Sequence, residues 1–77
     1  MPSLTLYYRE GCHLCDAFAE ELRGLQARHP FEFNSVDVDS APALAEKYGR
    51  RVPLLMQGEV VICEYFLDPQ RLHAHVQ

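Results

Sequence analysis

The sequence predicts a single α/β domain over residues 1–77, with three helices flanking a four-stranded mixed sheet. A chain of 77 residues has no room for a second hydrophobic core. Its short apolar runs switch between the alternation typical of strands and the spacing typical of amphipathic helices. Five prolines and four glycines separate these runs. The expected order of elements is β-α-β-α-β-β-α.

The first strand and the first helix follow each other directly along the chain. The run 4–8 is aliphatic, aromatic and β-branched, and it alternates as a strand does. From Cys12 the period becomes helical, and Pro30 is expected to stop this helix. Apolar residues at helical spacing predict its inner face: Leu14, Phe18, Leu22 and Leu25.

A second strand is predicted from two apolar stretches, 31–33 and 36–38. Their alternation slips in phase at Asn34-Ser35, which predicts a bend or a bulge there. Two strands joined by a helix should pair in parallel. A second helix is expected from near Ser40, with Gly49 at its C-cap.

The last third of the chain predicts a hairpin followed by a helix. The apolar runs 52–56 and 60–63 are so close that they should pair as antiparallel strands, with Gly58 supplying a positive φ in the turn. Asp68-Pro69 has the composition of an N-cap followed by the first residue of a helix. We expect this third helix on the same face of the sheet as the first.

The balance of charges limits the classes of partner. The formal net charge is −4, and acidic and basic residues are mixed along the chain. Neither a basic stripe for nucleic acid nor a polybasic tract for an anionic membrane is present. The sequence also lacks a run of signal-peptide type and an apolar stretch of bilayer length. We therefore expect a cytoplasmic monomer, and the three cysteines, an odd number, agree with that compartment.

Cys12-His13-Leu14-Cys15 lies where the first strand passes into the first helix. Unpaired backbone N–H groups and the helix dipole stabilise an anion at that end, which lowers a thiol pKa from about 8.5 toward or below neutrality. Cys12 is therefore the predicted nucleophile. Cys15 follows one turn later and is expected to resolve the mixed disulfide formed at Cys12. His13, when protonated, would favour the thiolate and make the disulfide more oxidising.

The three cysteines also allow a zinc site or a purely structural role. Two cysteines at this spacing can form half of a zinc site, but the remaining candidate ligands have no recognisable spacing: Cys63, His13, His29, His73 and His75. Cys63 follows a Val-Val-Ile run and is expected to be a small buried apolar residue. Because a bridge between Cys12 and Cys15 closes a very short loop, it would stabilise the fold little. The pair therefore points to chemistry.

Val52-Pro53 opens the predicted third strand, and with it the chain resembles the glutaredoxins and their thioredoxin-fold relatives. It is most similar to short bacterial glutaredoxin-like proteins with a Gly-Cys-x-Leu-Cys motif, here Gly11 to Cys15. The resemblance covers essentially the whole chain and implies a thioredoxin fold. It also implies that Pro53 is cis, that it keeps metal ions from the thiols, and that the Val52 backbone pairs with an extended thiol-bearing substrate.

The chain also departs from the glutaredoxin pattern. Glutaredoxins usually carry Cys-Pro-Tyr-Cys, a basic residue before it, and a Gly-Gly-x-Asp turn that holds glutathione. Arg9 is the candidate for the basic residue, and Arg50 or Arg51 is a candidate for contact with a carboxylate. The residues 63–66, Cys-Glu-Tyr-Phe, stand in place of the glycine turn. Glutathione is therefore only a candidate co-substrate.

The predicted function is that of a thiol–disulfide oxidoreductase acting in redox homeostasis and electron transfer. Cys12 and Cys15 are the predicted catalytic residues, and Arg9, His13, Arg51, Val52 and Pro53 the predicted substrate-binding residues. Protein or low-molecular-weight disulfides are the expected substrates, and an external thiol the reductant. No tightly bound cofactor or metal is expected. The alternatives are a non-catalytic adaptor, an iron–sulfur carrier with one Cys12 per subunit of a dimer, and a purely structural role.

Overall fold

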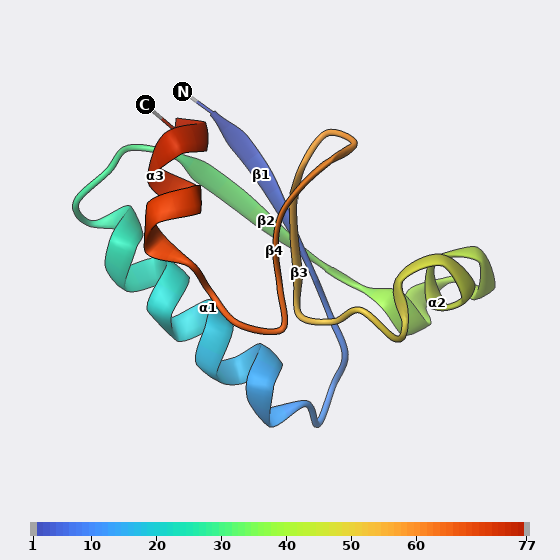
Figure 1. The fold of residues 1–77 in the computed structure, drawn as a ribbon. Coiled ribbons are helices and arrows are strands. Elements are labelled where there is room, and N and C mark those ends of the chain that lie inside the picture. Colours follow the sequence, from blue (N-terminus) through green and yellow to red (C-terminus); the bar gives the residue numbers. More distant parts are fainter. Residues whose placement is uncertain (1, 77) are drawn as a thin grey trace.

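A computed structural model describes residues 2–76 of the chain. The predicted order of strands and helices is confirmed, with one short 3₁₀ helix added (Figure 1). The elements are β1 (Ser3–Tyr8), α1 (His13–Gln26), β2 (Glu32–Asp37), η1 (Val38–Ser40), α2 (Pro42–Tyr48), β3 (Leu54–Gln57), β4 (Val60–Glu64) and α3 (Pro69–Val76). None of the helices within these residues is long and apolar enough to cross a membrane.

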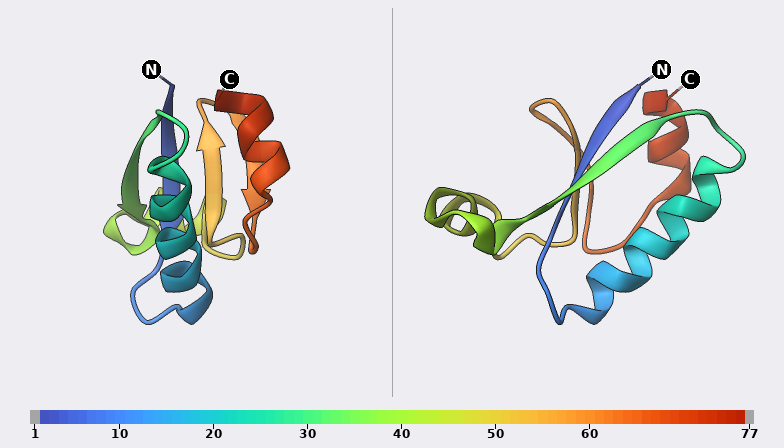
Figure 2. Two further views of the ribbon diagram at one scale, coloured as in Figure 1. Left: turned by 90° about the vertical axis from the view of Figure 1, so that its left-hand side faces the viewer. Right: turned by 180° about the vertical axis from the view of Figure 1, so that it is seen from behind.

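The four strands form one mixed sheet in the order β2-β1-β3-β4. β1 and β2 run in parallel, whereas β3 is antiparallel to both β1 and β4. Figures 1 and 2 show α1 and α3 together on one face of this sheet, with α2 placed apart from them. This arrangement is the predicted thioredoxin fold.

Two apolar clusters hold the helices to the sheet. Under α1 and α3, the buried side chains of Phe18, Leu22 and Leu72 pack with those of the central strands. The second cluster lies under α2 and consists of Val38, Tyr48, Leu54 and Met56. Each face of the sheet has its own apolar cluster, so the strands are packed on both sides. The loops at the ends of the strands therefore start from fixed positions.

The bulge expected at Asn34-Ser35 is wrong. β2 pairs with β1 without interruption over its whole length. Phe31 and Phe33 join the cluster under α1, whereas Val38 joins the cluster under α2, so the buried residues of this segment change face. The sheet does contain a register shift, between β3 and β4 at Leu55/Met56.

The ends of α1 also differ from expectation. Leu14 is 45 % exposed, because the first turn of α1 extends past the ends of the strands (Figure 1). The helix ends at Gln26, before Pro30 is reached, and the Gln26 side chain donates a hydrogen bond of 2.9 Å to the carbonyl of Phe31. The chain is therefore turned back toward β2 by a side-chain contact as well as by the proline.

The capping and turn predictions for the second half of the chain are confirmed. Gly58 has a φ of +59° in the β3–β4 turn. The Asp68 carboxylate accepts hydrogen bonds from the N–H groups of Gln70 at 3.1 Å and Arg71 at 3.3 Å, and so caps α3. Asp68 thereby fixes the start of the helix that follows the β4 loop.

Candidate active site

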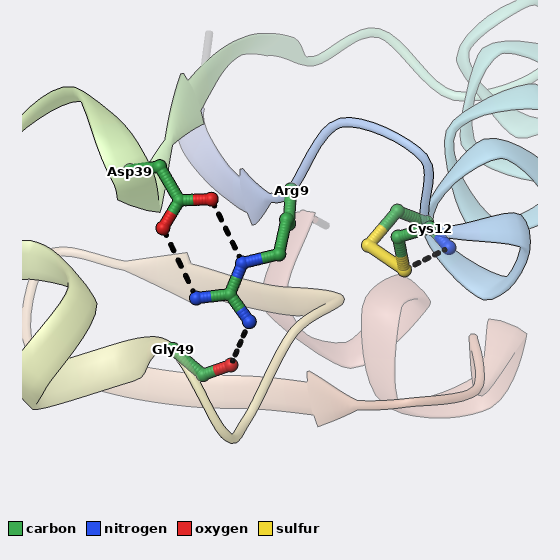
Figure 3. Close-up of a disulfide and its surroundings, with 5 residues drawn as sticks. Arg9, Cys12, Asp39 and Gly49 are labelled. Atoms are coloured by element: carbon green, nitrogen blue, oxygen red, sulfur yellow. Dashed lines mark hydrogen bonds and ion pairs between the residues drawn. A yellow bond between two sulfur atoms is a disulfide. The ribbon is translucent and has the colours of Figure 1, made fainter.

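Cys12 is the N-cap residue of α1 and forms a disulfide bond with Cys15. The N–H of Cys15 donates to Cys12 Sγ at 3.1 Å (Figure 3). The N–H of Asp16 donates to the Cys12 carbonyl at 3.0 Å. Gly11, with a φ of +76°, makes the turn that brings the chain into the helix. A backbone donor of the first helical turn thus points at the sulfur that would carry negative charge after reduction.

The two sulfurs differ in access. Cys12 is partly exposed, whereas Cys15 is only 2 % exposed. Cys15 also lines a cleft of about 280 Å³ that lies along α1, together with the charged residues Glu10, Asp16 and Arg23. Cys12 is therefore the more accessible of the two cysteines, and Cys15 lies buried behind it in the first turn of α1.

His13 and Leu14, the residues between the cysteines, are both exposed. Their side chains lie on the first turn of α1, next to the disulfide. The predicted effect of His13 on Cys12 stays a prediction, and the exposed Leu14 presents an apolar surface on the same turn of the helix.

Pro53 is cis, as the resemblance implied, and lies at the same end of the molecule. A chain of contacts shows this. The Pro53 carbonyl accepts a hydrogen bond of 2.7 Å from the N–H of Tyr65. Tyr65 in turn lines a groove with Leu14 of the first turn of α1. The loop that contains Pro53 is therefore joined, through Tyr65, to a groove that Leu14 of the first turn of α1 also lines.

Arg9 is engaged elsewhere. Its Nε and Nη2 donate to the two carboxylate oxygens of Asp39 at 2.9 and 3.2 Å, and its Nη1 donates to the Gly49 carbonyl at 3.1 Å. Figure 3 shows the guanidinium turned toward these groups and away from the disulfide. Arg9 thus joins the end of β1 to η1 and α2. Arg9 meets the cysteine pair through its backbone, since its carbonyl accepts a hydrogen bond of 3.3 Å from the N–H of Cys12, while its guanidinium points away from the disulfide.

Gly49 makes room for this contact. Its φ is −58°, so it does not have the left-handed conformation usual for a C-cap glycine. A Cβ at this position would collide with the carbonyl oxygen of Ala45 and lie 3.0 Å from Arg9 Nη2. The glycine at the end of α2 is therefore required by close approach.

The Arg9–Asp39 pair predicts a pH-dependent stability. The hydrogen bond from Arg9 lowers the pKa of the Asp39 carboxyl below its ordinary value. Because the pKa is lower in the folded state, the stabilisation is present at neutral pH and is lost as the pH falls through that pKa. Asp39→Asn should therefore unfold at lower urea concentration than the wild type at neutral pH, and the difference should shrink below about pH 4. A difference that does not change with pH would contradict this assignment.

Arg51 is paired with Glu64, a contact that the sequence analysis missed. Arg51 Nε and Nη2 donate to the two oxygens of Glu64 at 3.1 and 3.0 Å. The sequence of the hairpin could have indicated this contact, because Arg51 and Glu64 lie at similar distances on either side of the turn at Gly58. In an antiparallel pair, such positions come close together.

Cys63 is buried and lies outside the cysteine pair, as expected. Its Sγ accepts a hydrogen bond of 3.4 Å from the N–H of Asp68. Burial raises the pKa of its thiol, which favours the neutral form. This environment is that of a structural cysteine at the start of the loop to α3.

Three curated mycobacterial proteins match nearly the whole chain. Two of them are the uncharacterized proteins Mb0520 of Mycobacterium bovis and Rv0508 of Mycobacterium tuberculosis. Each is 30 % identical over 80 residues, which cover 97 % of this chain and 82 % of the relative.

Solved structures show the same fold. Protein Ne2328 from Nitrosomonas europaea superposes with a TM-score of 0.85 at 36 % identity, covering 100 % of this chain and 94 % of that protein. Protein XcR50 from X. campestris gives 0.68 at 41 % identity, covering 92 % and 91 %. The family model for the Glutaredoxin-like domain (DUF836) matches residues 3–77. The chain therefore belongs to the glutaredoxin-like domain family.

Proposed function

We propose that the protein is a thiol–disulfide oxidoreductase in which Cys12 attacks and Cys15 resolves. The observation that carries this proposal is the position of Cys12, a partly exposed residue at the N-terminus of α1 whose Sγ accepts a hydrogen bond from the N–H of Cys15. A thiolate is the nucleophile in disulfide exchange, and this is where a helix stabilises one.

The reaction balances in two exchanges. In the first, the Cys12 thiolate attacks one sulfur of the substrate disulfide, a mixed disulfide forms, and the other substrate sulfur leaves as a thiolate that takes up a proton. In the second, Cys15 loses its proton and its sulfur attacks Cys12, which releases the remaining substrate thiol and forms the Cys12–Cys15 disulfide. The substrate gains two electrons and two protons, and the protein dithiol loses them. An external thiol reductant then reverses the oxidation.

The neighbouring residues support this chemistry. Val52 lies just before β3 and belongs to no helix or strand. Within residues 2–76, its backbone N–H and carbonyl form no hydrogen bond with another backbone group, so they can pair with an extended substrate. His13 lies beside Cys12 at the surface and would stabilise the thiolate when protonated. The proposed substrates are protein or low-molecular-weight disulfides, with glutathione as a candidate reductant, and the proposed setting is a monomer in the cytoplasm.

The pH profile of Cys12 alkylation tests this function. With its pKa lowered to near or below neutrality, Cys12 of the reduced protein should react with iodoacetamide about tenfold faster than a model thiol at about pH 6. Mass spectrometry of the digested protein identifies the alkylated cysteine. In concentrated urea, where α1 is lost, the advantage should disappear. A Cys12 that reacts no faster than the model thiol in the folded protein contradicts the proposal.

A further inference from the structure

The Arg51–Glu64 ion pair lies beside the loop that carries cis-Pro53. Arg51 is two residues before Pro53, and Glu64 is the last residue of β4. The two side chains are 37 % and 34 % exposed, and Arg51 donates from Nε and Nη2 to the two carboxylate oxygens of Glu64. The hydrogen bond raises the pKa of Arg51 and lowers that of Glu64, so both groups are charged over the physiological range. The Arg51 guanidinium is therefore already paired within the chain.

Tyr65 fixes this arrangement. Its φ of +66° lies in the left-handed region, which is unfavourable for a residue with a Cβ. Two hydrogen bonds hold it there: its N–H donates to the Pro53 carbonyl at 2.7 Å, and its hydroxyl donates to the Arg50 carbonyl at 2.8 Å. The end of β4 is thus fastened to the loop before β3 on both sides of the ion pair.

An apolar groove lies beside this corner, and Leu14, one of the two residues between the cysteines, lines it. It has a volume of about 250 Å³ and lies between the first turns of α1 and the loop from β4 to α3. Its exposed apolar side chains are Leu14, Tyr65 and Phe66, of which Phe66 is 71 % exposed. The charged residue that lines it, Glu21, is acidic. A ligand in this groove would meet apolar surface and negative charge together.

We propose that Glu64 determines the class of substrate: by holding Arg51, it excludes thiols that carry carboxylates and leaves the site selective for polypeptide disulfides with an apolar residue beside the cysteine. This inference rests on the proposed oxidoreductase function. Glutathione carries two carboxylates and has little apolar surface, so it would meet an Arg51 that is already paired and would gain little from the groove. An extended polypeptide segment can place its cysteine at Cys12 and a neighbouring apolar side chain against Leu14 and Phe66. The net charge of −4 on the protein also disfavours the binding of thiols that carry carboxylates.

Reduction of matched peptide disulfides tests this inference. The probes are the disulfide dimers of two short peptides that differ only in having Leu or Glu next to the cysteine, with dithiothreitol as the regenerating thiol. The wild type should show a higher kcat/KM for the Leu peptide. In Glu64→Gln, the freed Arg51 should bind the glutamate, and the ratio of Leu to Glu reduction should fall about fivefold, the effect of one exposed ion pair. This change should weaken at high salt.

Two further variants separate the specific effect from a general one. Glu59→Gln removes the same charge from the turn at the other end of the β3–β4 hairpin, and should leave the ratio as in the wild type. Phe66→Ser, at a side chain too exposed to matter for folding, should lower kcat/KM for the Leu peptide about fivefold while changing the Glu peptide less.

The outcomes distinguish the two proposals. If the wild type reduces neither peptide, the oxidoreductase function fails and this inference fails with it. If both peptides are reduced and Glu64→Gln leaves their ratio unchanged, or changes it no more than Glu59→Gln does, the inference alone is wrong. Faster reduction of oxidised glutathione than of the Leu peptide by the wild type would also overturn it.

Discussion

Cys12→Ser is expected to lower the rate of disulfide reduction at least about a thousandfold, because a serine hydroxyl does not ionise near neutral pH and cannot form a mixed disulfide. Cys15 remains in this variant, but it is 2 % exposed and cannot take over the attack. The measurement is the multiple-turnover reduction of a peptide disulfide, with dithiothreitol as the regenerating thiol. Cys63 lies in another environment, buried in β4, so its removal should not cause the same loss.

Cys63→Ala is the matched control for this result. Cys63 is a buried, free cysteine whose contacts are with the loop to α3. Its removal should leave turnover within about twofold of the wild type, since small buried cysteines behave as apolar side chains. Substantial turnover by Cys12→Ser, or equal losses in the two variants, would show that the reaction does not depend on the position of Cys12.

Leu22→Ala should lower the free energy of unfolding by about 3 kcal/mol, the usual effect of emptying a fully buried leucine site. Leu22 is 0 % exposed and packs between α1 and the sheet, in the cluster that also contains Leu4 and Leu72. The total free energy of unfolding of a domain of this size is on the order of 4–12 kcal/mol, so this substitution would remove a large part of it. Urea unfolding followed by circular dichroism measures the change.

Leu14→Ala makes the same substitution two turns earlier on the same helix. Its side chain is 45 % exposed, so the change in unfolding free energy should be within about 0.5 kcal/mol. The periodicity of the sequence assigns Leu14 and Leu22 to the same face of α1, and the structure separates them. Equal destabilisation by the two substitutions would contradict the position of the helix on the sheet.

The fold could be predicted because each boundary has a local cause. Gly58 and Asp68 act through the turn and the helix cap in which they themselves lie, and a sequence pattern shows such causes directly. The continuity of β2 could not be predicted. The change of face between Phe33 and Val38 looks like a bulge unless the positions of both covering helices are known.

The candidate site shows the same division. Cys12 and Cys15 were found because their spacing and their place before a helix are local features. The partners of Arg9 and Arg51 were not found. Arg9 contacts Asp39, 30 residues away, and Arg51 contacts Glu64, 13 residues away. Such long-range ion pairs decide which arginine side chains can contact a substrate. A residue-by-residue analysis of the sequence does not show these pairs.

The most direct test of the account is the capture of a mixed disulfide. Cys15→Ser, reduced and then mixed with a peptide disulfide, should accumulate a covalent adduct whose mass equals protein plus one peptide, and digestion should place the bond at Cys12. Cys12→Ser, treated in the same way, should give no adduct. An adduct that forms equally well in Cys12→Ser, or one located at Cys63, would contradict the assignment of Cys12 as the attacking residue.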